Sequence, residues 1–221
     1  LTIGTLDNWQ TSRKGTSMVL HINFSSKHDR QYQHLIRPEE RPFQSVCHPM
    51  DEKFHTLSWS RIDIDMDDGE ALIEEIQTDW IGYALMDRKA LEQCDSEEEA
   101  RRYLERVYGE KTNNNPRQFL RYLRNTLKPH ICLWAEATLA ATLWFLRDEL
   151  GIRRIFYHTF ETGNWLKGMR YWGKPPRSLY TDLPQQFCFQ ETLNPPAFIL
   201  RSRRRWTLKE LEKLRFYVLE V

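Results

Sequence analysis

The chain has 221 residues, of which 40% are hydrophobic and 13% aromatic, and this composition argues against a disordered chain. Its 32 basic and 31 acidic residues give a formal net charge of +1, which excludes a whole-chain electrostatic attraction to nucleic acid or anionic lipid. The four cysteines are widely spaced without a C-x-x-C pair, and they indicate free thiols in a reducing compartment.

Neither a signal peptide nor a membrane span is expected. The stretch Leu1–Gly15 is polar and lacks the apolar core of a signal peptide. The longest apolar segment, Ile131–Leu146, has about 16 residues and includes Glu136, whereas a span needs about 20 apolar residues. We therefore expect a cytoplasmic protein with no membrane partner.

The first part of the chain is predicted to form antiparallel strands. Met18–Phe24 is typical of a strand, and the Pro-containing stretch His28–Met50 is typical of a loop. Two strand-like runs, Thr56–Asp65 and Glu70–Trp80, flank a turn with an Asp-Gly pair. That pair favours a β-hairpin.

The middle of the chain is predicted to be helical. Ser96-Glu97-Glu98-Glu99 is a capping box, and Arg117–Leu127 repeats apolar residues at helical spacing. Ile131–Leu150 is apolar nearly all round, which predicts a buried helix across the sheet. We interpret the chain as one domain, 1–221, with a helical insertion at about 81–130.

The last part of the chain returns to strands. Arg153–Phe160 is predicted to be a strand parallel to an earlier one, because strand, helix and strand in this order imply a right-handed crossover. Trp165–Trp172 predicts a short helix, Ser178–Thr192 one or two short strands, and a capping box at Thr207–Glu210 a terminal helix to about Val218. The predicted fold class is α+β: a mixed, mainly antiparallel sheet with a buried central helix and one parallel strand.

A polar row at the end of the second hairpin strand is the first candidate site. Alternation along the strand places Glu75, Gln77 and Asp79 on one face, and Trp80 follows Asp79 at the strand end on the other face. Such a row can bind a substrate or position a general base; the alternative is a strand end that runs into water. Strand ends beside helices are common ligand sites, which favours function.

Glu136 is a second candidate, because it lies inside the predicted buried helix. A carboxylate there needs a partner or a cavity, and Arg61 is one possible partner. The side chain is then either half of a structural ion pair or an acid or base of a catalytic site.

His158 is a third candidate, at the carboxyl end of the predicted parallel strand with Thr159, Glu161 and Asn164. Open sheets bind ligands outside such strand ends. His158 is either an acid–base group or a hydrogen-bonded core residue.

Other chemical motifs are not found. The sequence has no G-x-x-x-x-G-K-[ST], G-x-G-x-x-G or G-x-S-x-G motif. His21, His34, His48 and His55 are dispersed without metal-ligand spacing, so no metal is expected. A basic cluster at 201–205 either contacts phosphate or forms a solvated turn, and nucleic acid is not an expected partner.

The segment Leu72–Trp80, LIEEIQTDW, resembles the EEIQSDW element of uncharacterised bacterial proteins and of large polyvalent proteins of phages and conjugative elements. Thr78 stands where Ser is usual, and the resemblance continues through Trp134–Gly163. It implies a link to phage or mobile-element conflict, without a biochemical role.

The order of the elements is similar to the core of the GCN5-related N-acetyltransferases. The similarity covers the hairpin, a helix, the parallel strand ending near Phe160 and a short helix at Asn164–Met169. It implies acetyl-coenzyme A as cofactor and an unknown small-molecule or protein acceptor. The glycine-rich phosphate loop of that family, R/Q-x-x-G-x-G/A, is not found after Trp80, and residues 81–130 intervene.

Three functions remain open. In a small-group acyl transferase, Glu75, Gln77 and Asp79 would line the acceptor side, and His158 or Glu136 would move protons. A non-catalytic binding or interaction module is favoured by the missing phosphate loop. In an ADP-ribosyltransferase-like domain, the Glu/Gln-rich strand would meet a nicotinamide dinucleotide.

Overall fold

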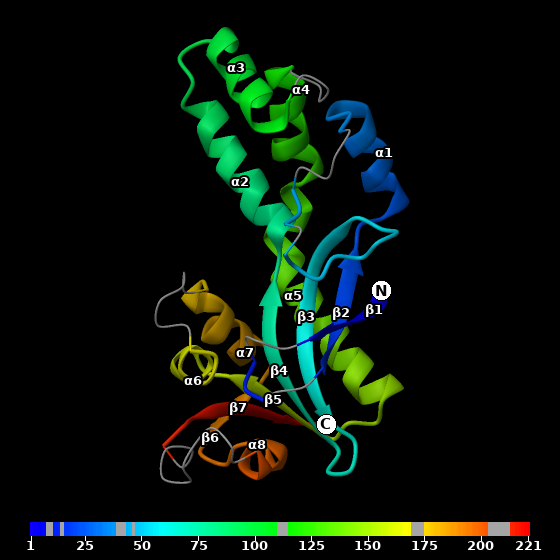
Figure 1. The fold of residues 1–221 in the computed structure, drawn as a ribbon, viewed down its shortest axis with the longest axis vertical. Helices are drawn as coiled ribbons and strands as arrows, with labels where there is room; N and C mark the ends of the chain where they lie inside the picture. Colours follow the sequence, from blue (N-terminus) through cyan, green and yellow to red (C-terminus); the bar gives the residue numbers. More distant parts are fainter. Residues whose placement is uncertain are drawn as a thin grey trace. The chain divides into compact units, whose positions relative to one another are not determined.

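A computed structural model describes residues 1–7, 11–13, 16–38, 43–45, 47–109, 115–168, 175–202 and 213–221 (Figure 1). The chain forms two compact units. Residues 1–20, 59–77 and 135–221 make up the first, here called the sheet unit. Residues 21–58 and 78–134 make up the second, here called the helical unit.

The strands form one mixed sheet in the order β1-β2-β3-β4-β5-β7-β6. Among the described strand pairs, β4 and β5 run parallel and the others antiparallel, which confirms the predicted α+β class. The strands are β1 (Thr2–Asp7), β2 (Thr16–Asn23), β3 (Thr56–Asp65), β4 (Glu70–Gln77), β5 (Arg154–His158), β6 (Gln190–Thr192) and β7 (Phe216–Glu220).

The predicted hairpin is confirmed as β3 and β4. Its turn is set locally: the Asp65 carboxylate accepts hydrogen bonds from the amides of Asp67 and Asp68 at 3.1 and 3.2 Å. Gly69 adopts φ +64°, a conformation that favours glycine. The second strand ends at Gln77, earlier than expected, because Thr78 caps the next helix with its side chain.

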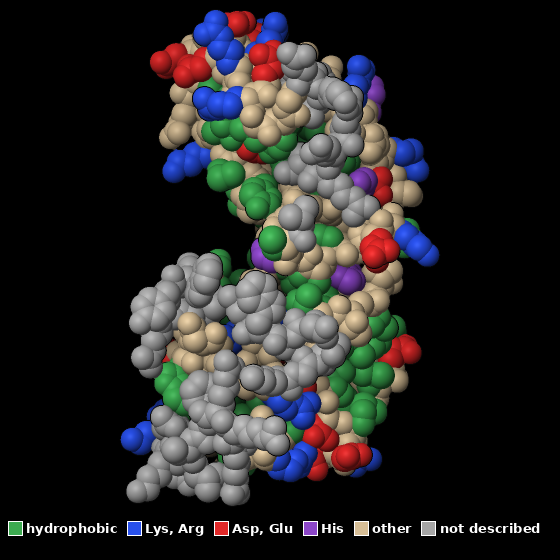
Figure 2. All heavy atoms as spheres, viewed as in Figure 1, with side chains coloured by type: hydrophobic (Ala, Val, Ile, Leu, Met, Phe, Trp, Pro, Cys, Tyr) green, Lys and Arg blue, Asp and Glu red, His purple; other side chains and the backbone are tan. Residues whose placement is uncertain are grey.

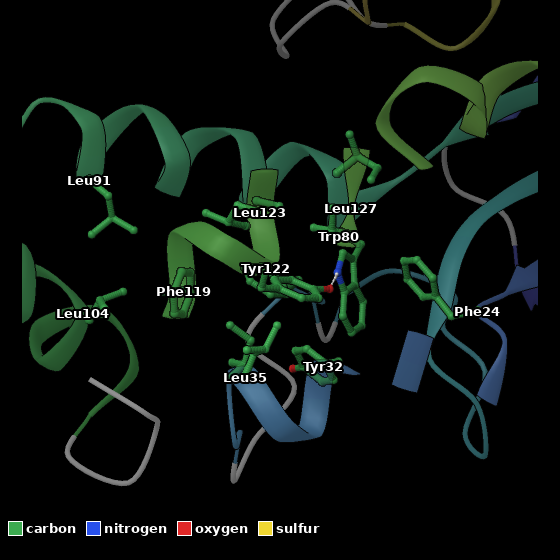
Figure 3. Packing of buried hydrophobic residues seen from close by; sticks show 14 of the residues in the cluster. Phe24, Tyr32, Leu35, Trp80, Leu91, Leu104, Phe119, Tyr122, Leu123 and Leu127 are labelled. Atoms are coloured by element: carbon green, nitrogen blue, oxygen red, sulfur yellow. Dashed lines mark hydrogen bonds between the residues drawn. The ribbon is translucent and has the colours of Figure 1, made fainter. Parts of the chain in front are cut away.

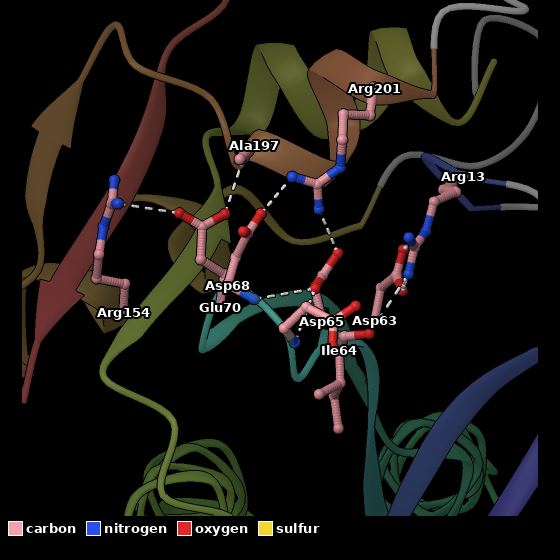
Figure 4. A network of polar contacts seen from close by, with 10 residues as sticks. Arg13, Asp63, Ile64, Asp65, Asp68, Glu70, Arg154, Ala197 and Arg201 are labelled. Atoms are coloured by element: carbon pink, nitrogen blue, oxygen red, sulfur yellow. Dashed lines mark hydrogen bonds and ion pairs between the residues drawn. The ribbon is translucent and has the colours of Figure 1, made fainter.

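The hairpin end is fixed by a network of charged side chains from distant segments (Figure 4). Arg13 contacts Asp63 at 2.9 Å, and Arg201 contacts Asp65 at 2.6 Å and also Asp68. Arg201, the first member of the basic cluster 201–205, is thus engaged with carboxylates. The rest of that cluster, residues 203–205, lies outside the described residues.

Apolar burial supports each unit separately. In the sheet unit Leu72, Phe156, Phe198 and Phe216 are part of a buried cluster. The helices of this unit are η2 (Phe145–Glu149), α6 (Phe160–Leu166), η4 (Arg177–Tyr180), α7 (Asp182–Gln186) and α8 (Ala197–Arg201).

The helical unit is built around an aromatic core (Figure 3). Trp80 lies at its centre, fully buried, and its indole Nε1 donates to the Tyr122 hydroxyl at 2.8 Å. The His28 ring stacks on Phe24 at 3.6 Å between centroids, and its Nε2 lies 3.0 Å from the same hydroxyl. Its helices are α1 (Ser26–Leu35), α2 (Asp79–Glu92), α3 (Glu97–Tyr108), α4 (Pro116–Arg121), η1 (Tyr122–Thr126) and the first part of α5 (Lys128–Trp144).

One helix stands where a loop was expected. The interpretation of His28–Met50 as a loop is wrong for its first part, which belongs to α1. Ser25 caps this helix by accepting a hydrogen bond from the His28 amide at 3.3 Å. Its buried residues, His28, Tyr32 and Leu35, follow one helical face, a pattern that the nearby prolines obscured.

The predicted burial of the long helix is also wrong. The helix is α5, continued by η2, and only one face is buried, through residues such as Thr138, Leu139 and Thr142. Leu133 and Trp144 are 59% and 46% exposed. Glu136 is half-buried on this helix and does not need the partner that full burial would require.

The C-terminal predictions fail where tertiary pairing overrides local signals. Most of Ser178–Thr192 is helical, in η4 and α7, and only Gln190–Thr192 is a strand. Phe216–Glu220 is a strand, where a helix to Val218 was expected, because β7 pairs along all of β5. The predicted capping box, Thr207–Glu210, lies outside the described residues.

Replacing Tyr122 by Phe tests the polar contacts of the aromatic core. The substitution leaves the Trp80 indole N–H and the His28 Nε2 without their shared partner, so unfolding in urea should need about 1–3 kcal/mol less free energy. Tyr83→Phe, at an exposed site of the same unit, should change it by less than about 0.5 kcal/mol. Equal losses in both variants would contradict this account.

Candidate functional site

Buried polar residues gather in the sheet unit where β4 and β5 stop pairing. The last parallel pair is Ile73 with Tyr157, and Glu74 and His158 follow it. The register between β3 and β4 shifts from Ile62↔Ile73 to Arg61↔Glu75, so Glu74 is the extra residue of a β-bulge. A bulge reorients neighbouring side chains, and both Glu74 and Glu75 are buried here.

Glu74 is held by Ser12 and His158. Its carboxylate accepts from the Ser12 amide at 3.0 Å and from the Ser12 hydroxyl at 3.1 Å. His158 Nε2 lies 3.0 Å from the same carboxylate and 3.0 Å from the Ser12 hydroxyl. These contacts satisfy a carboxylate that is fully buried.

The protonation states follow from this geometry. Burial opposes the charge of Glu74, but the hydrogen bonds and charges around it outweigh burial and lower its pKa. Burial also lowers the pKa of His158, against the effect of Glu74. Neutral His158 therefore donates from Nε2 to ionised Glu74.

Ser12, His158 and Glu74 do not form a nucleophilic triad. Such a triad needs the serine and the carboxylate on opposite ring nitrogens of the histidine. Here both contact Nε2, and Nδ1 has no hydrogen-bond partner among the described residues. The arrangement is that of a hydrogen-bonded core histidine.

A second group of charges surrounds Glu75. Arg61 lies 2.7 Å from its carboxylate and Lys167 lies 3.6 Å from it. Lys167 also donates to the main-chain carbonyl of Glu74, and its ammonium lies 6.0 Å from the centre of the Tyr180 ring. Burial opposes the Lys167 charge, but Tyr180, Glu75 and Glu74 outweigh it and raise the pKa of Lys167.

Tyr180 connects this charged group with a cavity of ≈ 480 Å³. Burial raises the pKa of the Tyr180 phenol, and the Lys167 charge partly counteracts that effect. Thr159 caps α6 at the cavity, where its hydroxyl donates to the Arg215 carbonyl at 3.0 Å. The lining residues are Thr159, Glu161, Thr162, Trp165, Arg177, Tyr180, Thr181, Glu191, Lys213, Leu214, Arg215 and Tyr217.

Several predicted site residues lie beside Glu75 or line the cavity. Arg61 pairs with Glu75, and not with Glu136 as one alternative had it. Thr159 and Glu161 line the cavity at the carboxyl end of β5. Asn164 lies in α6, where its side chain donates to the Phe160 carbonyl at 2.6 Å.

The structure separates the three residues of the predicted polar row. Glu75 and Gln77 lie on β4, but the expectation that Asp79 shares their strand face is wrong, because Asp79 begins α2 in the helical unit. The Asp79 carboxylate accepts from the Ser45 amide at 2.9 Å and contacts His48 Nδ1 at 2.8 Å. Trp80 belongs to the aromatic core described above.

Glu74, Lys167 and Tyr180 were missed by the sequence analysis. Glu74 carried a signal, because it lies between Leu72 and Ile76 on the other face of the strand, where an acid is out of place. Nothing local marks Lys167 or Tyr180, whose environment arises from segments distant in the sequence.

The described residues contain no group of three or more His, Cys, Asp and Glu side chains that could hold a metal ion. No described helix is both long and apolar enough to cross a membrane. Comparison of the chain with protein-family models, curated proteins and solved structures finds no match.

The neutral state of buried His158 predicts a pH effect on stability. Because its pKa is lower in the folded state, the unfolded chain binds more protons below pH 6.5, and the free energy of unfolding falls as the pH falls. Replacing His158 by Gln should remove up to about 1.4 kcal/mol per pH unit from this slope, measured by urea unfolding between pH 7 and pH 5.

The matched control is His34→Gln, at an exposed position, which should leave the slope unchanged. A slope that is the same in the His158→Gln variant and the native chain would show that His158 is not held neutral.

Proposed function

We propose that the chain is a small-group acyltransferase, with its acceptor in the ≈ 480 Å³ cavity at the carboxyl end of β5. The observation that carries the proposal is the placement of Tyr180. Tyr180 lines the cavity, and its ring centre lies 6.0 Å from the ammonium of the buried Lys167, which in turn lies 3.6 Å from the Glu75 carboxylate. Perturbed ionisable groups beside a cavity are characteristic of catalytic sites.

The element order supports an acyl thioester, such as acetyl-coenzyme A, as the donor. In the reaction, the lone pair of an acceptor amine attacks the thioester carbonyl carbon. A C–N bond forms, the C–S bond breaks, the amine loses a proton and the thiolate gains one. Lys213, a cationic side chain at the cavity, is suited to the donor's phosphates.

Tyr180 supplies the proton to the leaving thiolate. Its raised pKa keeps the phenol protonated at neutral pH, and the nearby Lys167 ammonium stabilises the phenolate that forms on transfer. Glu161, a carboxylate of the same cavity, accepts the proton of the amine. His158 and Glu74 position this part of β4, and Glu136 has no role in the reaction.

Lys167 acts through Tyr180 and is a positioning residue. Its ammonium contacts both the Glu74 carbonyl, at the point where the pairing of β4 with β5 ends, and the Glu75 carboxylate. Its removal takes away a positive charge that lowers the pKa of Tyr180, so the phenol becomes a weaker acid.

Acyl transfer is tested by release of the free thiol from acetyl-coenzyme A in the presence of a panel of amines. Tyr180→Phe should lower kcat by about 10²–10⁴-fold with little change in KM, because general acid catalysis contributes that much. Tyr83→Phe is the exposed control and should retain full activity.

The Lys167 variants separate positioning from folding. Lys167→Met should lower kcat and move the basic limb of its pH profile upward, and Lys167→Arg should restore part of the rate. Full turnover in Tyr180→Phe, or no thiol release with any amine, would overturn the acyltransferase proposal.

A non-catalytic binding module is the second candidate. It is favoured by the ion pairs at the cavity, Glu161–Arg177 at 2.9 Å and Arg215–Glu191 at 3.1 Å, which neutralise lining charges. Thermal unfolding with millimolar acetyl-coenzyme A or NAD distinguishes the candidates, because a ligand that binds the folded state raises Tm. A rise with NAD alone would support an ADP-ribosyltransferase-like domain; no rise with either would leave the binding module.

A further inference from the structure

We propose that the helical unit carries a separate binding site for a phosphate-bearing small molecule, in a hollow between α1 and the η1–α5 segment. The hollow has a volume of ≈ 700 Å³. Its lining includes Lys27, Arg30 and His34 from α1, Arg121 from the end of α4, Asn125 from η1 and His130 from α5. In Figure 2 several Lys, Arg and His side chains are visible around α1, with an acidic side chain beside one of them.

The charge of this hollow is one-sided. Three of its lining residues, Lys27, Arg30 and Arg121, are cationic, and no Asp or Glu lines it within the described part of the chain. The carboxylate of Asp29, adjacent in sequence, is engaged with His28 at 3.1 Å and with His55 at 3.0 Å. Within the described part of the helical unit, the lining of the hollow is therefore positively charged, which favours the binding of anions.

Other arginines of the helical unit differ in this respect. Arg102, Arg117 and Arg124 contact glutamates at 3.2, 2.8 and 2.9 Å. Among the described residues, no carboxylate lies within 4 Å of the guanidinium of Arg30 or Arg121. Two arginines that face one hollow without carboxylates can each grip a phosphate by paired N–H donors.

One lining residue of the hollow, His28, is held in place by its neighbours. His28 is 3% exposed there, and its ring is fixed by stacking on Phe24 and by hydrogen bonds to Asp29 and Tyr122. Burial lowers the pKa of His28 to about 4, so the His28 ring is uncharged at neutral pH. The anion is therefore bound by Lys27, Arg30 and Arg121, while the neutral His28 ring contributes to the shape of the site.

The size and charge favour a small phosphorylated molecule over a polymer. Small-molecule sites commonly have about 300–1,000 Å³, a range that includes this hollow. The formal net charge of the whole chain is only +1, and the first turn of α3 is acidic. A long polyanion would need many phosphate contacts, which this charge distribution does not offer. Amides from Asn125 and Gln31 can hydrogen-bond a sugar or base.

Binding is tested by calorimetry on the full chain with two probes, inorganic tripolyphosphate and ATP. At least one of them should bind at submillimolar concentration. Arg30→Ala and Arg121→Ala should each raise Kd by about tenfold, because the ligand loses a charged hydrogen-bond partner. Arg102→Ala, which removes the same charge from α3, should change Kd by less than about twofold.

The outcomes that would overturn the proposal are distinct. They are no binding of either probe at millimolar concentration, or equal weakening by Arg102→Ala. A third is tighter binding of single-stranded oligonucleotide or of phosphatidylserine vesicles than of ATP, with a steep salt dependence. Probe binding that persists in Tyr180→Phe, and is lost with Arg30 and Arg121, would assign the site to the helical unit whatever the fate of the acyltransferase proposal.

Discussion

The fully buried carboxylate of Glu74 is the constraint on which the sheet unit depends. An ionised carboxylate without water must be satisfied by protein donors, and these come from Ser12 and His158, far apart in the sequence. Meeting this need fixes the segment after β1 and the end of β5 against the bulge of β4. The same bulge turns Glu75 toward Arg61 and Lys167, so the charged group beside the cavity depends on how Glu74 is held. Loss of either hydrogen-bond partner would leave a charge in the interior and disturb both clusters.

Local sequence predicted the parts of the fold whose causes are local. The Asp-Gly turn gave the hairpin, the Ser96 capping box gave α3, and the order of strand, helix and strand gave the parallel pair. The candidate site was only partly predictable. Glu75, Thr159 and Glu161 were found from strand position, whereas Lys167 and Tyr180 acquire their surroundings only when distant segments meet. The same limit explains β7, whose strand form is set by pairing with β5, against a local helix signal.

The two proposed sites differ in whether their cationic side chains are paired with carboxylates. In the sheet unit, Lys167 and Arg61 are buried and share the Glu75 carboxylate, so their charges serve to set the state of neighbouring groups. In the helical unit, Arg30 and Arg121 face an open hollow and remain available to a ligand. A buried and compensated cation tunes chemistry, and an exposed and uncompensated one recruits anions. Each site is contained within one unit, so each can be altered without changing the residues of the other.

The division of the chain has a consequence for how this protein can change over generations. The backbone passes from one unit to the other four times, after residues 20, 58, 77 and 134, through β2, β3, the β4–α2 junction and α5. A genetic exchange that imported a new helical unit would have to replace two separate stretches of coding sequence at once. Single crossovers would instead join mismatched halves of β2, β3 or α5. Transfer of the helical unit alone therefore needs two coordinated replacements, whereas a point substitution can change the surface of either unit without altering the path of the chain.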